Sequence, residues 1–461
     1  MSRRRGPRSA EAIGHTTLGP RAVPELMRVH RTRAAAADHA LLDNGLQVVA
    51  VRRSGAPLVE VRLRIPFGGT TAKLAGQHAA RAELLSATTM LGTASRDREQ
   101  VDVALSDVGG HLYAAVDPQR LLYTGSVLAN GLPTLLEMLG EILTTAAYRG
   151  TDVAGERDRM VEHLALSMSQ PSVTARIALQ RKRFGDHPAA DEMPDPALVG
   201  AVSPAAIRGL HHRAVVPDGS TLVLVGDLNP GKTVEMVAGA LSGWVSQRQA
   251  VVLTAPPAVT GTDVEALHRN GSVQSQVRLT AAAAGRTSPD YAALQITNLI
   301  YAGYFSSRLV ENIREDKGYT YHAGSGIEFW PGTAALTVSF DTNTESTAPA
   351  LLEARYELGR LALLPPTAAE VESARNYALG TLAISLSTQA GYASTLSSIH
   401  GAGLDVEWLR THPARLAAVS VDDVAEAAAR YLAPARFTGI VQGNLDAIAD
   451  GLRSIGGVQL P

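Results

Sequence analysis

The sequence repeats itself over most of its length. Residues Arg53–Leu63 recur as Arg269–Leu279, a displacement of 216 positions, with an Arg, a Gly and the tripeptide Val-Arg-Leu at matching places. Other matches fall 216 or 217 positions apart: Leu135–Glu137 with Leu351–Glu353, Val202 and Ser203 with Val419 and Ser420, Pro217 with Pro434, and Gly226 and Leu228 with Gly443 and Leu445. So long a series with one inserted residue is not a coincidence, and the chain is a duplication of one unit.

Both copies show the same order of strand and helix patterns. The predicted strands are residues 59–65, 120–127 and 221–226 in the first copy, and residues 276–282, 334–341 and 437–443 in the second. Helical stretches with a period of 3.6 residues separate these alternating segments. This order predicts an α+β fold of two homologous lobes, each a largely antiparallel sheet with helices packed on it.

The boundaries of the lobes follow from local composition. The first 33 residues hold eight arginines and few bulky apolar residues, so residues 1–38 are expected to form a basic, disordered arm. A stretch rich in Pro, Gly, Thr and Ser follows the first copy and predicts a linker at 246–265. The expected lobes are therefore residues 39–245 and 266–461.

Charge and composition exclude several classes of function. The formal net charge of -2 gives no electrostatic attraction for nucleic acid or acidic lipid. There is no cysteine, which rules out disulfides and thiolate metal sites. Because no run of about 18 apolar residues exists and no apolar segment follows the arginine cluster, we expect neither a membrane span nor a secretory signal. The expected location is the cytoplasm.

Two segments carry a resemblance to a known family. The first copy opens with LDNGLQVVAV at 42–51, and the second contains FSSRLVENIREDKGYTY at 305–321. In residue types, spacing and position within the duplicated unit, the second segment resembles the second-domain motif of the pitrilysin/insulinase peptidases, which include mitochondrial processing peptidase. The resemblance covers nearly all of the chain after the arginine-rich start, and it implies the two-lobed fold of that family.

The resemblance also implies a zinc site on a helix of the first copy, with His-x-x-Glu-His shortly before a Gly-Thr pair. Two His at i and i+4 share one face of a helix and bind zinc, while the Glu takes a proton from the metal-bound water. Counted back from Gly92 and Thr93, the two His positions hold Glu83 and Ala87, and the position of the base holds Ser86. The Ser hydroxyl cannot act as the carboxylate base, and the Ala side chain has no atom that could bind zinc.

A third zinc ligand of the family is a Glu on a later helix. The segment that begins with Glu156 and Arg157 resembles that helix and puts His163 at the ligand position. With all four positions substituted, we expect no catalytic residue and no metal in this chain, because Glu83 and His163 alone would bind a metal weakly.

The second copy keeps the residues that active relatives direct at the substrate. These are an Arg and a Tyr seven residues apart with a Gly between them, a pattern met by Arg314, Gly318 and Tyr321. The guanidinium and the hydroxyl would donate hydrogen bonds to a peptide carbonyl or to the developing oxyanion. The alternative is that Arg314 forms a helix-end ion pair with Glu311 or Glu315 and that Tyr321 belongs to the core.

The first copy lacks the zinc ligands, and the second copy keeps the Arg/Tyr pair. This combination predicts a non-catalytic subunit of a two-chain zinc endopeptidase. The implied heterodimer partner is a zinc-carrying member of the family, and the implied substrate is an extended peptide bound as an added strand at a sheet edge. No nucleic acid or membrane partner is expected. The alternative is a structural scaffold, like the core proteins of respiratory cytochrome complexes, which has no need of Arg314 and Tyr321.

A rival hypothesis comes from another class of protein. Residues Gly226–Thr233 read GDLNPGKT, which satisfies the phosphate-loop pattern between a predicted strand and a predicted helix, so Lys232 and Thr233 are candidate nucleotide ligands. Against this, the second copy has no Lys-Thr at the same place, and phosphate loops follow the first strand of a parallel sheet. For His211 and His212, a role in packing or at the surface is expected.

Overall fold

The computed structural model describes residues 36–461. The arm predicted for residues 1–38 thus lies almost wholly outside the described residues, and the first strand, β1, begins at Ala37. Within the described part, no helix combines the length and the hydropathy that crossing a bilayer requires.

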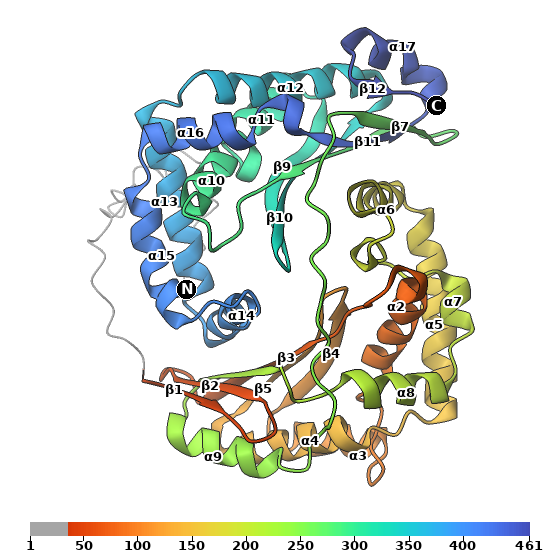
Figure 1. The fold of residues 1–461 in the computed structure, drawn as a ribbon, viewed down its shortest axis with the longest axis vertical. Coiled ribbons are helices and arrows are strands. Elements are labelled where there is room, and N and C mark those ends of the chain that lie inside the picture. The colour runs from red at the N-terminus through yellow and green to blue at the C-terminus, as the bar shows by residue number, and fades with distance from the viewer. Residues whose placement is uncertain (1–35) are drawn as a thin grey trace, which may run out of the picture. The chain divides into compact units, whose positions relative to one another are not determined.

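The N-terminal sheet has six strands in the order β1-β2-β6-β3-β5-β4 (Figure 1). All neighbours are antiparallel except β2 and β6, which run parallel. The bounds are Ala37–Leu41 (β1), Gln47–Arg52 (β2), Leu58–Pro66 (β3), His111–Asp117 (β4), Arg120–Leu128 (β5) and Thr221–Gly226 (β6).

The C-terminal sheet follows the same plan, in the order β12-β7-β11-β8-β10-β9. Here β7 runs parallel to both β11 and β12, and the other neighbours are antiparallel. The bounds are Val264–His268 (β7), Gln274–Ala282 (β8), Thr320–Trp330 (β9), Thr333–Asn343 (β10), Thr438–Gly443 (β11) and Val458–Gln459 (β12). Five strands match in order between the sheets, which confirms the predicted α+β fold of two homologous lobes.

Helices also recur in the same order in both lobes. Those of the N-terminal lobe are Ala72–Thr88 (α2), Arg98–Ser106 (α3), Leu132–Thr145 (α4), Gly150–Ser169 (α5), Pro171–Phe184 (α6), Pro196–Gly200 (α7), Pro204–Ala214 (α8) and Pro230–Ala240 (α9). Those of the C-terminal lobe are Tyr291–Asn298 (α10), Arg308–Val310 (α11), Thr347–Leu363 (α12), Ala368–Ser385 (α13), Gln389–His400 (α14), Val406–Ala418 (α15), Val421–Tyr431 (α16) and Leu445–Ile455 (α17).

The repeated Val-Arg-Leu has a structural cause. Nη1 of Arg62 donates to the carbonyl oxygen of the preceding residue and to that of Gly125 on β5, at 3.0 and 3.1 Å. Nη1 of Arg278 makes the same two bonds, with Phe340 of β10 as the second acceptor, at 2.9 and 3.1 Å. An arginine that bonds across two strands in this way ties the centre of each sheet together.

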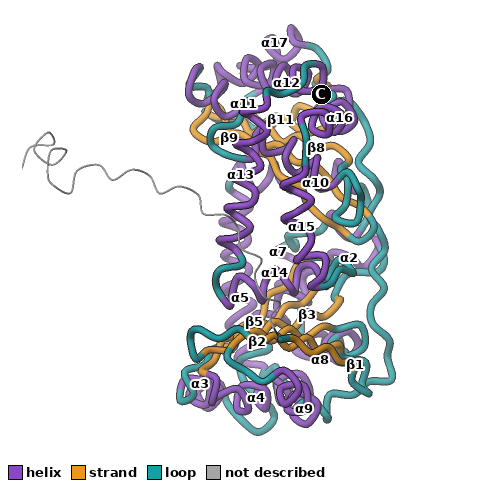
Figure 2. The backbone as a smooth tube through the Cα atoms, turned by 90° about the vertical axis from the view of Figure 1, so that its left-hand side faces the viewer, coloured by secondary structure: helices purple, strands orange, loops and turns teal. Residues whose placement is uncertain are grey.

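Equivalent helices of the two lobes pack on each other's sheets. Helix α6 lies against β8 and β11, and α14 lies against β3 and β6. The second contact is apolar, because Ala393, Leu396 and Ile399 cover Val223 and Val225. Helices α4 and α9 lie on the opposite face of the N-terminal sheet from α14 (Figure 1, Figure 2). Each lobe therefore supplies part of the other lobe's core.

Candidate functional site

The positions predicted to have lost the zinc ligands lie on α2 and α5. Ser86 is buried, and its hydroxyl donates to the carbonyl oxygen of Glu83 at 2.9 Å, so it is engaged within its own helix. Ala87 has no polar side-chain atom. His163 is exposed on α5. Among the residues that the structure describes, no three His, Asp or Glu side chains are grouped so that they could hold a metal ion.

Glu83 lines a small cavity of about 30 Å³ together with His78, Asp117 and Asp191. Burial raises the pKa of Glu83 to about 7. Burial also lowers the pKa of His78 to about 4, and the charges of Arg81 and Arg213 act in the same direction. The raised pKa favours the protonated, uncharged carboxyl of Glu83, which disfavours binding of a cation there, whereas the neutral His78 ring argues neither way.

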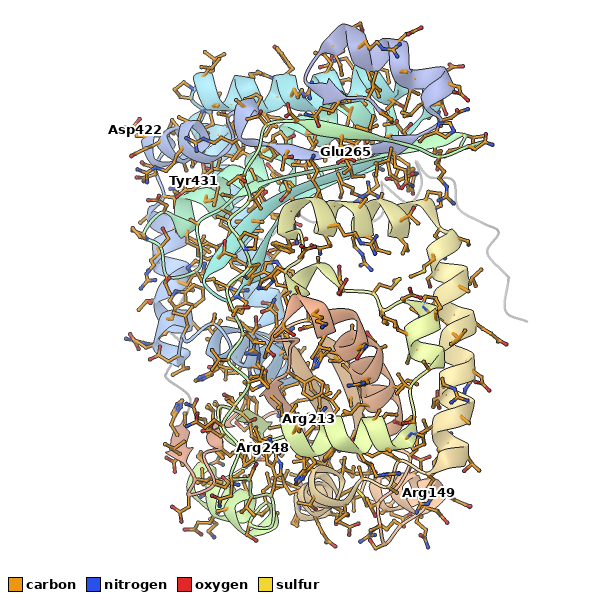
Figure 3. All side chains as sticks on the ribbon, turned by 45° about the vertical axis from the view of Figure 1, so that its right-hand side comes forward. Arg149, Arg213, Arg248, Glu265, Asp422 and Tyr431 are labelled. Carbon is orange, nitrogen blue, oxygen red and sulfur yellow. The ribbon has the colours of Figure 1, made fainter. Side chains whose placement is uncertain are left out.

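The Gly-Thr pair after α2 has a role of its own. Gly92 adopts a φ of 130°, where a side chain would be strained, and an added Cβ would collide with the Arg149 guanidinium. Arg149, labelled in Figure 3, directly precedes α5. Its Nη2 donates to the carbonyl oxygens of Thr93 and Arg96 at 3.0 and 3.1 Å. These contacts shape the loop whether or not the helix before it carries zinc ligands.

Arg314 and Tyr321 lie beside each other in the C-terminal lobe. Arg314 belongs to a π-helix, Glu311–Asp316 (η4), and Tyr321 is near the start of the edge strand β9. The guanidinium carbon of Arg314 is 5.5 Å from the ring centroid of Tyr321 and 4.6 Å from that of Phe305. Single π-helical turns often mark functional positions in proteins.

Exposure contradicts one part of the alternative interpretation of this pair, the part that places Tyr321 in the core. The Tyr321 side chain is 88% exposed, so it does not belong to the core. Nε of Arg314 does approach Glu315 at 3.3 Å, as the ion-pair alternative predicted, but this surface contact is weak and leaves the rest of the guanidinium accessible. An exposed Tyr and a partly exposed Arg are therefore available to a ligand.

The remaining polar residues of the motif hold the segment in place. Arg308 makes two bonds to Glu370 of α13, at 2.6 and 3.1 Å, and Asn312 donates to Glu353 and Glu357 of α12, at 3.0 and 2.9 Å. Gly318 has a φ of 62° and turns the chain from η4 into β9. The motif thus combines anchoring residues with two residues that point to the surface.

Two cavities meet beside Tyr321. One, of about 460 Å³, is lined by Phe305 and Arg314, and the other, of about 550 Å³, is lined by Tyr321 and Arg278. His322 lines both. Phe305 and His322 were not predicted as site residues. The available signal was their place in the chain, because Phe305 begins the motif and His322 directly follows it.

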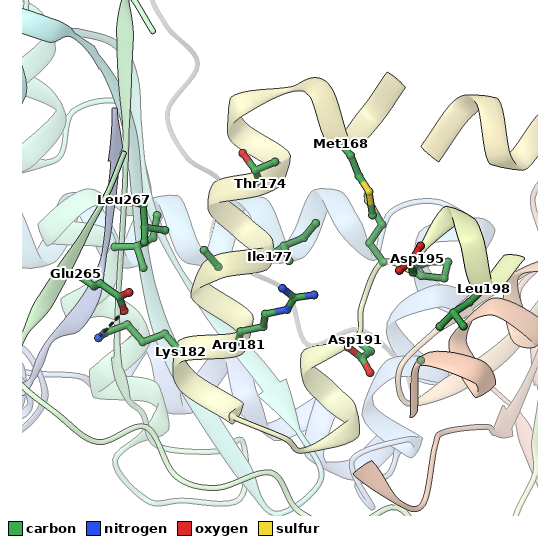
Figure 4. Close-up of a pocket in the computed structure, with 15 residues that line it drawn as sticks. Met168, Thr174, Ile177, Arg181, Lys182, Asp191, Asp195, Leu198, Glu265 and Leu267 are labelled. Carbon is green, nitrogen blue, oxygen red and sulfur yellow. Dashed lines mark hydrogen bonds and ion pairs between the residues drawn. The ribbon is translucent and has the colours of Figure 1, made fainter. Parts of the chain in front are cut away.

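A larger cavity, of about 740 Å³, lies where α6 meets β7 and β11 (Figure 4). Apolar side chains such as Met168 and Ile177 share its wall with Arg181 and with the ion pair of Lys182 and Glu265, whose atoms are 3.5 Å apart. Neither Arg314 nor Tyr321 lines it, so it is separate from the predicted substrate residues.

The phosphate-loop hypothesis does not fit the loop before α9. Thr233 is buried, so its hydroxyl is not available to a metal-bound nucleotide. The side chain of Asn229 accepts from the amide of Lys232 at 3.2 Å and caps the helix where a phosphate would sit. His211 is a packing residue: its ring bonds the hydroxyl of Tyr148 at 2.7 Å and the Leu143 carbonyl at 2.9 Å.

Two family models together match most of the described chain. Residues 48–196 match the model of the insulinase family, peptidase family M16, and residues 201–377 match the model described as the peptidase M16 inactive domain. An uncharacterized zinc protease of Mycobacterium tuberculosis is 24% identical over 372 residues, which covers 79% of this chain and 84% of the relative. Human mitochondrial cytochrome b-c1 complex subunit 1 is 25% identical over 317 residues, 64% of each chain.

Solved structures agree on the fold. A peptidase M16 inactive domain from Pseudomonas fluorescens superimposes with a TM-score of 0.80 at 20% identity, over 88% of this chain and 98% of that one. A protease from Helicobacter pylori superimposes with a TM-score of 0.79 at 16% identity, over 89% of this chain and 100% of that one. The chain therefore belongs to the M16 family of insulinase-type peptidases, and within it to the non-catalytic members.

Proposed function

We propose that this chain is the non-catalytic subunit of a two-chain zinc endopeptidase. Its partner is a zinc-carrying member of the same family, which holds the metal and the general base. This chain contributes half of the peptide chamber and directs Arg314 and Tyr321 at the substrate. The chain needs no cofactor of its own, because the zinc belongs to the partner.

One observation carries the proposal: the exposed Arg314–Tyr321 pair. Placing a large aromatic ring in water forgoes the stabilisation that burial would provide. The guanidinium carbon lies within about 6 Å of the ring centroids of both Phe305 and Tyr321, so cation–π attraction favours this orientation before any ligand arrives. A pair that costs stability and is oriented in advance is what a binding site requires.

The chemistry of the pair suits an extended peptide. A guanidinium has five donors, and a phenol hydroxyl adds one more, so together they can bind the oxygen atoms of a peptide. Strand β9, which carries Tyr321, is the outermost strand of its sheet, and among the strands that the structure describes it pairs only with β10. A peptide added as a strand near such an edge is bound mainly through its backbone, which makes length and extended conformation more important than sequence.

A second candidate function is a scaffold without proteolytic role. The similarity to human cytochrome b-c1 complex subunit 1 favours it. In a scaffold the chain would still associate with a partner, but Arg314 and Tyr321 would have no ligand.

Reconstitution separates the two functions. The full chain is co-purified with a zinc-carrying M16 protein of the same organism, and cleavage of a quenched fluorescent peptide is followed for each chain alone and for the mixture. The proposal predicts cleavage by the mixture and none by this chain alone. A stable complex that cleaves at the same rate with wild-type chain and with Arg314→Ala would favour the scaffold instead.

A further inference from the structure

Two glycines lie on the same face of β9, and the fold requires neither. Gly324 and Gly326 are two residues apart and therefore point to one side of the sheet. Neither has a positive φ. An added Cβ at Gly326 would meet nothing closer than the Thr337 hydroxyl at 3.8 Å, and one at Gly324 would meet nothing closer than the His322 ring at 3.7 Å. Both distances are ordinary van der Waals contacts.

The duplicated lobe shows that side chains fit at these places. Arg62 of β3 and Arg278 of β8 occupy equivalent positions in the two sheets. When the sheets are aligned on these two arginines, Tyr113 and Ala115 of β4 take the places of Gly324 and Gly326 of β9. Glycine inside a strand lowers stability and is typical of places where a ligand approaches the backbone. The glycines of β9 are thus explained by the space they leave, not by the fold.

That space is the cavity of about 460 Å³ beside Arg314. Besides the two glycines, the small hydroxyl residues Thr337 and Ser339 line it, as do Arg314 and His322. No acidic side chain is among its lining residues. Small polar walls with an arginine suit a carboxylate, which a guanidinium binds with charge-assisted hydrogen bonds.

The carboxylates on the neighbouring stretches of the same strands are already neutralised. Glu328 of β9 forms an ion pair with Arg183 of α6, and Asp341 of β10 forms one with Arg278 at 2.7 Å. Within residues 36–461, the single ion pair of Arg314 joins Nε to Glu315, which leaves its two terminal nitrogens for a ligand. The two terminal nitrogens of Arg314 are therefore the charged donors that line the cavity.

We propose that this cavity is a specificity pocket for a carboxylate of the bound peptide. The inference rests on the proposed function and adds that the pocket, opened by Gly324 and Gly326, selects an acidic residue next to the backbone that Tyr321 contacts. The carboxylate belongs either to a Glu or Asp side chain or to the C-terminus of the peptide, and both sources share the same chemistry.

Peptide binding to the full chain tests the pocket. The probes are fluorescein-labelled peptides of Ala and Thr that carry one Glu at successive positions, with matched sets that carry Gln or Lys, each with a free or an amidated C-terminus. Fluorescence anisotropy gives the affinities. We expect one position at which Glu improves binding about tenfold over Gln, and more over Lys. A gain that depends on the free C-terminus alone would assign the pocket to the terminal carboxylate.

Filling the pocket provides the decisive variant. Gly326→Val places a β-branched side chain in the cavity, and strand propensity predicts that its thermal midpoint is no lower than that of wild type. We expect the preference for Glu over Gln to disappear. The control is Gly239→Ala in α9, where nothing lies within 4 Å of the added methyl group and the preference should persist.

Outcomes for the pocket and for the proposed function are distinct. Binding without any preference for a carboxylate, or a preference that survives Gly326→Val, overturns the pocket while the proposed function stands. Absence of binding by every probe also overturns the pocket, and the cleavage assay with the zinc-carrying partner then decides the proposed function separately.

Discussion

The guanidinium carbon of Arg314 lies 5.5 Å from the ring centroid of Tyr321, although the two residues belong to different elements. The left-handed turn at Gly318 brings them together, and the Phe305 ring packs on the same guanidinium at 4.6 Å. A guanidinium attracted to two neighbouring rings has fewer orientations than a free surface arginine. The pair is thus a preformed unit, and it should act as one.

Removal of the Arg314 guanidinium should reduce catalysis by the reconstituted peptidase. We expect Arg314→Ala to lower kcat/KM about 100-fold, because the guanidinium binds the peptide both in the ground state and in the transition state. Tyr321→Phe keeps the ring and loses only the hydroxyl, so its kcat should fall about tenfold. Steady-state kinetics on a fluorogenic peptide, with gel filtration to verify assembly, gives both values.

The matched control for these variants is Arg410→Ala. This arginine is two-thirds exposed on α15 and pairs with Glu407 of the same helix. Turnover should be unaffected. A similar loss for Arg410→Ala and Arg314→Ala would show that general surface charge, and not the pair, governs activity.

Arg308 should matter for stability and not for substrate. Burial alone would raise the pKa of Glu370, but the fork of Arg308 and the bonds from Thr367 outweigh it and lower that pKa to about 2. The stabilisation of the folded chain by ionised Glu370 is complete above the ordinary Glu pKa of about 4.5, and it is lost as the pH falls toward 2. Because Glu370 is partly exposed, Glu370→Gln should cost about 1 kcal/mol at neutral pH.

Urea unfolding at several pH values measures this effect. The difference between wild type and Glu370→Gln should shrink as the pH approaches 2. If the difference is the same at pH 7 and pH 2.5, the ion pair with Arg308 is not its source.

Glu83 should have the opposite pH dependence. Its pKa of about 7 in the folded chain exceeds the ordinary value of about 4.5. The contribution of the protonated carboxyl to the free energy of unfolding is therefore complete below pH 4.5 and is lost as the pH rises to 7. Glu83→Gln removes the charge that burial penalises, so at pH 8 the variant should be about 2 kcal/mol more stable than wild type. At pH 4 the two should unfold at the same urea concentration, and a difference of equal size at both pH values would contradict the shifted pKa.

The ion pair of Arg183 and Glu328 should anchor α6 to the C-terminal sheet. The Arg183 side chain is 0% exposed and also bonds Gln180 at 2.8 Å, so loss of its partner leaves a buried charge uncompensated. Glu328→Gln should cost about 3 kcal/mol and lower the thermal midpoint. Glu407→Gln, which breaks an exposed ion pair, is the control and should leave the midpoint unchanged. Equal midpoints for both variants would show that the buried pair contributes nothing.

Much of each lobe could be predicted from local pattern. The strands predicted at 59–65 and 276–282 correspond to β3 and β8. Both strands are buried on both faces, because α14 packs on β3 and α6 packs on β8. The edge strands β4 and β9 were missed. Strand β9 includes Gly324 and Gly326, which remove the alternating signal, whereas β4 does alternate, with Leu112, Ala114 and Val116 together on one face.

The sequence by itself determined the duplication, the family motif and the substituted zinc positions, because these depend only on residue types and their spacing. Tertiary structure alone decided that α6 and α14 pack on opposite lobes, that Tyr321 is exposed, and that the glycines of β9 open a cavity beside Arg314. Packing partners and exposure depend on contacts between residues far apart in the chain, and local periodicity carries no information about those contacts.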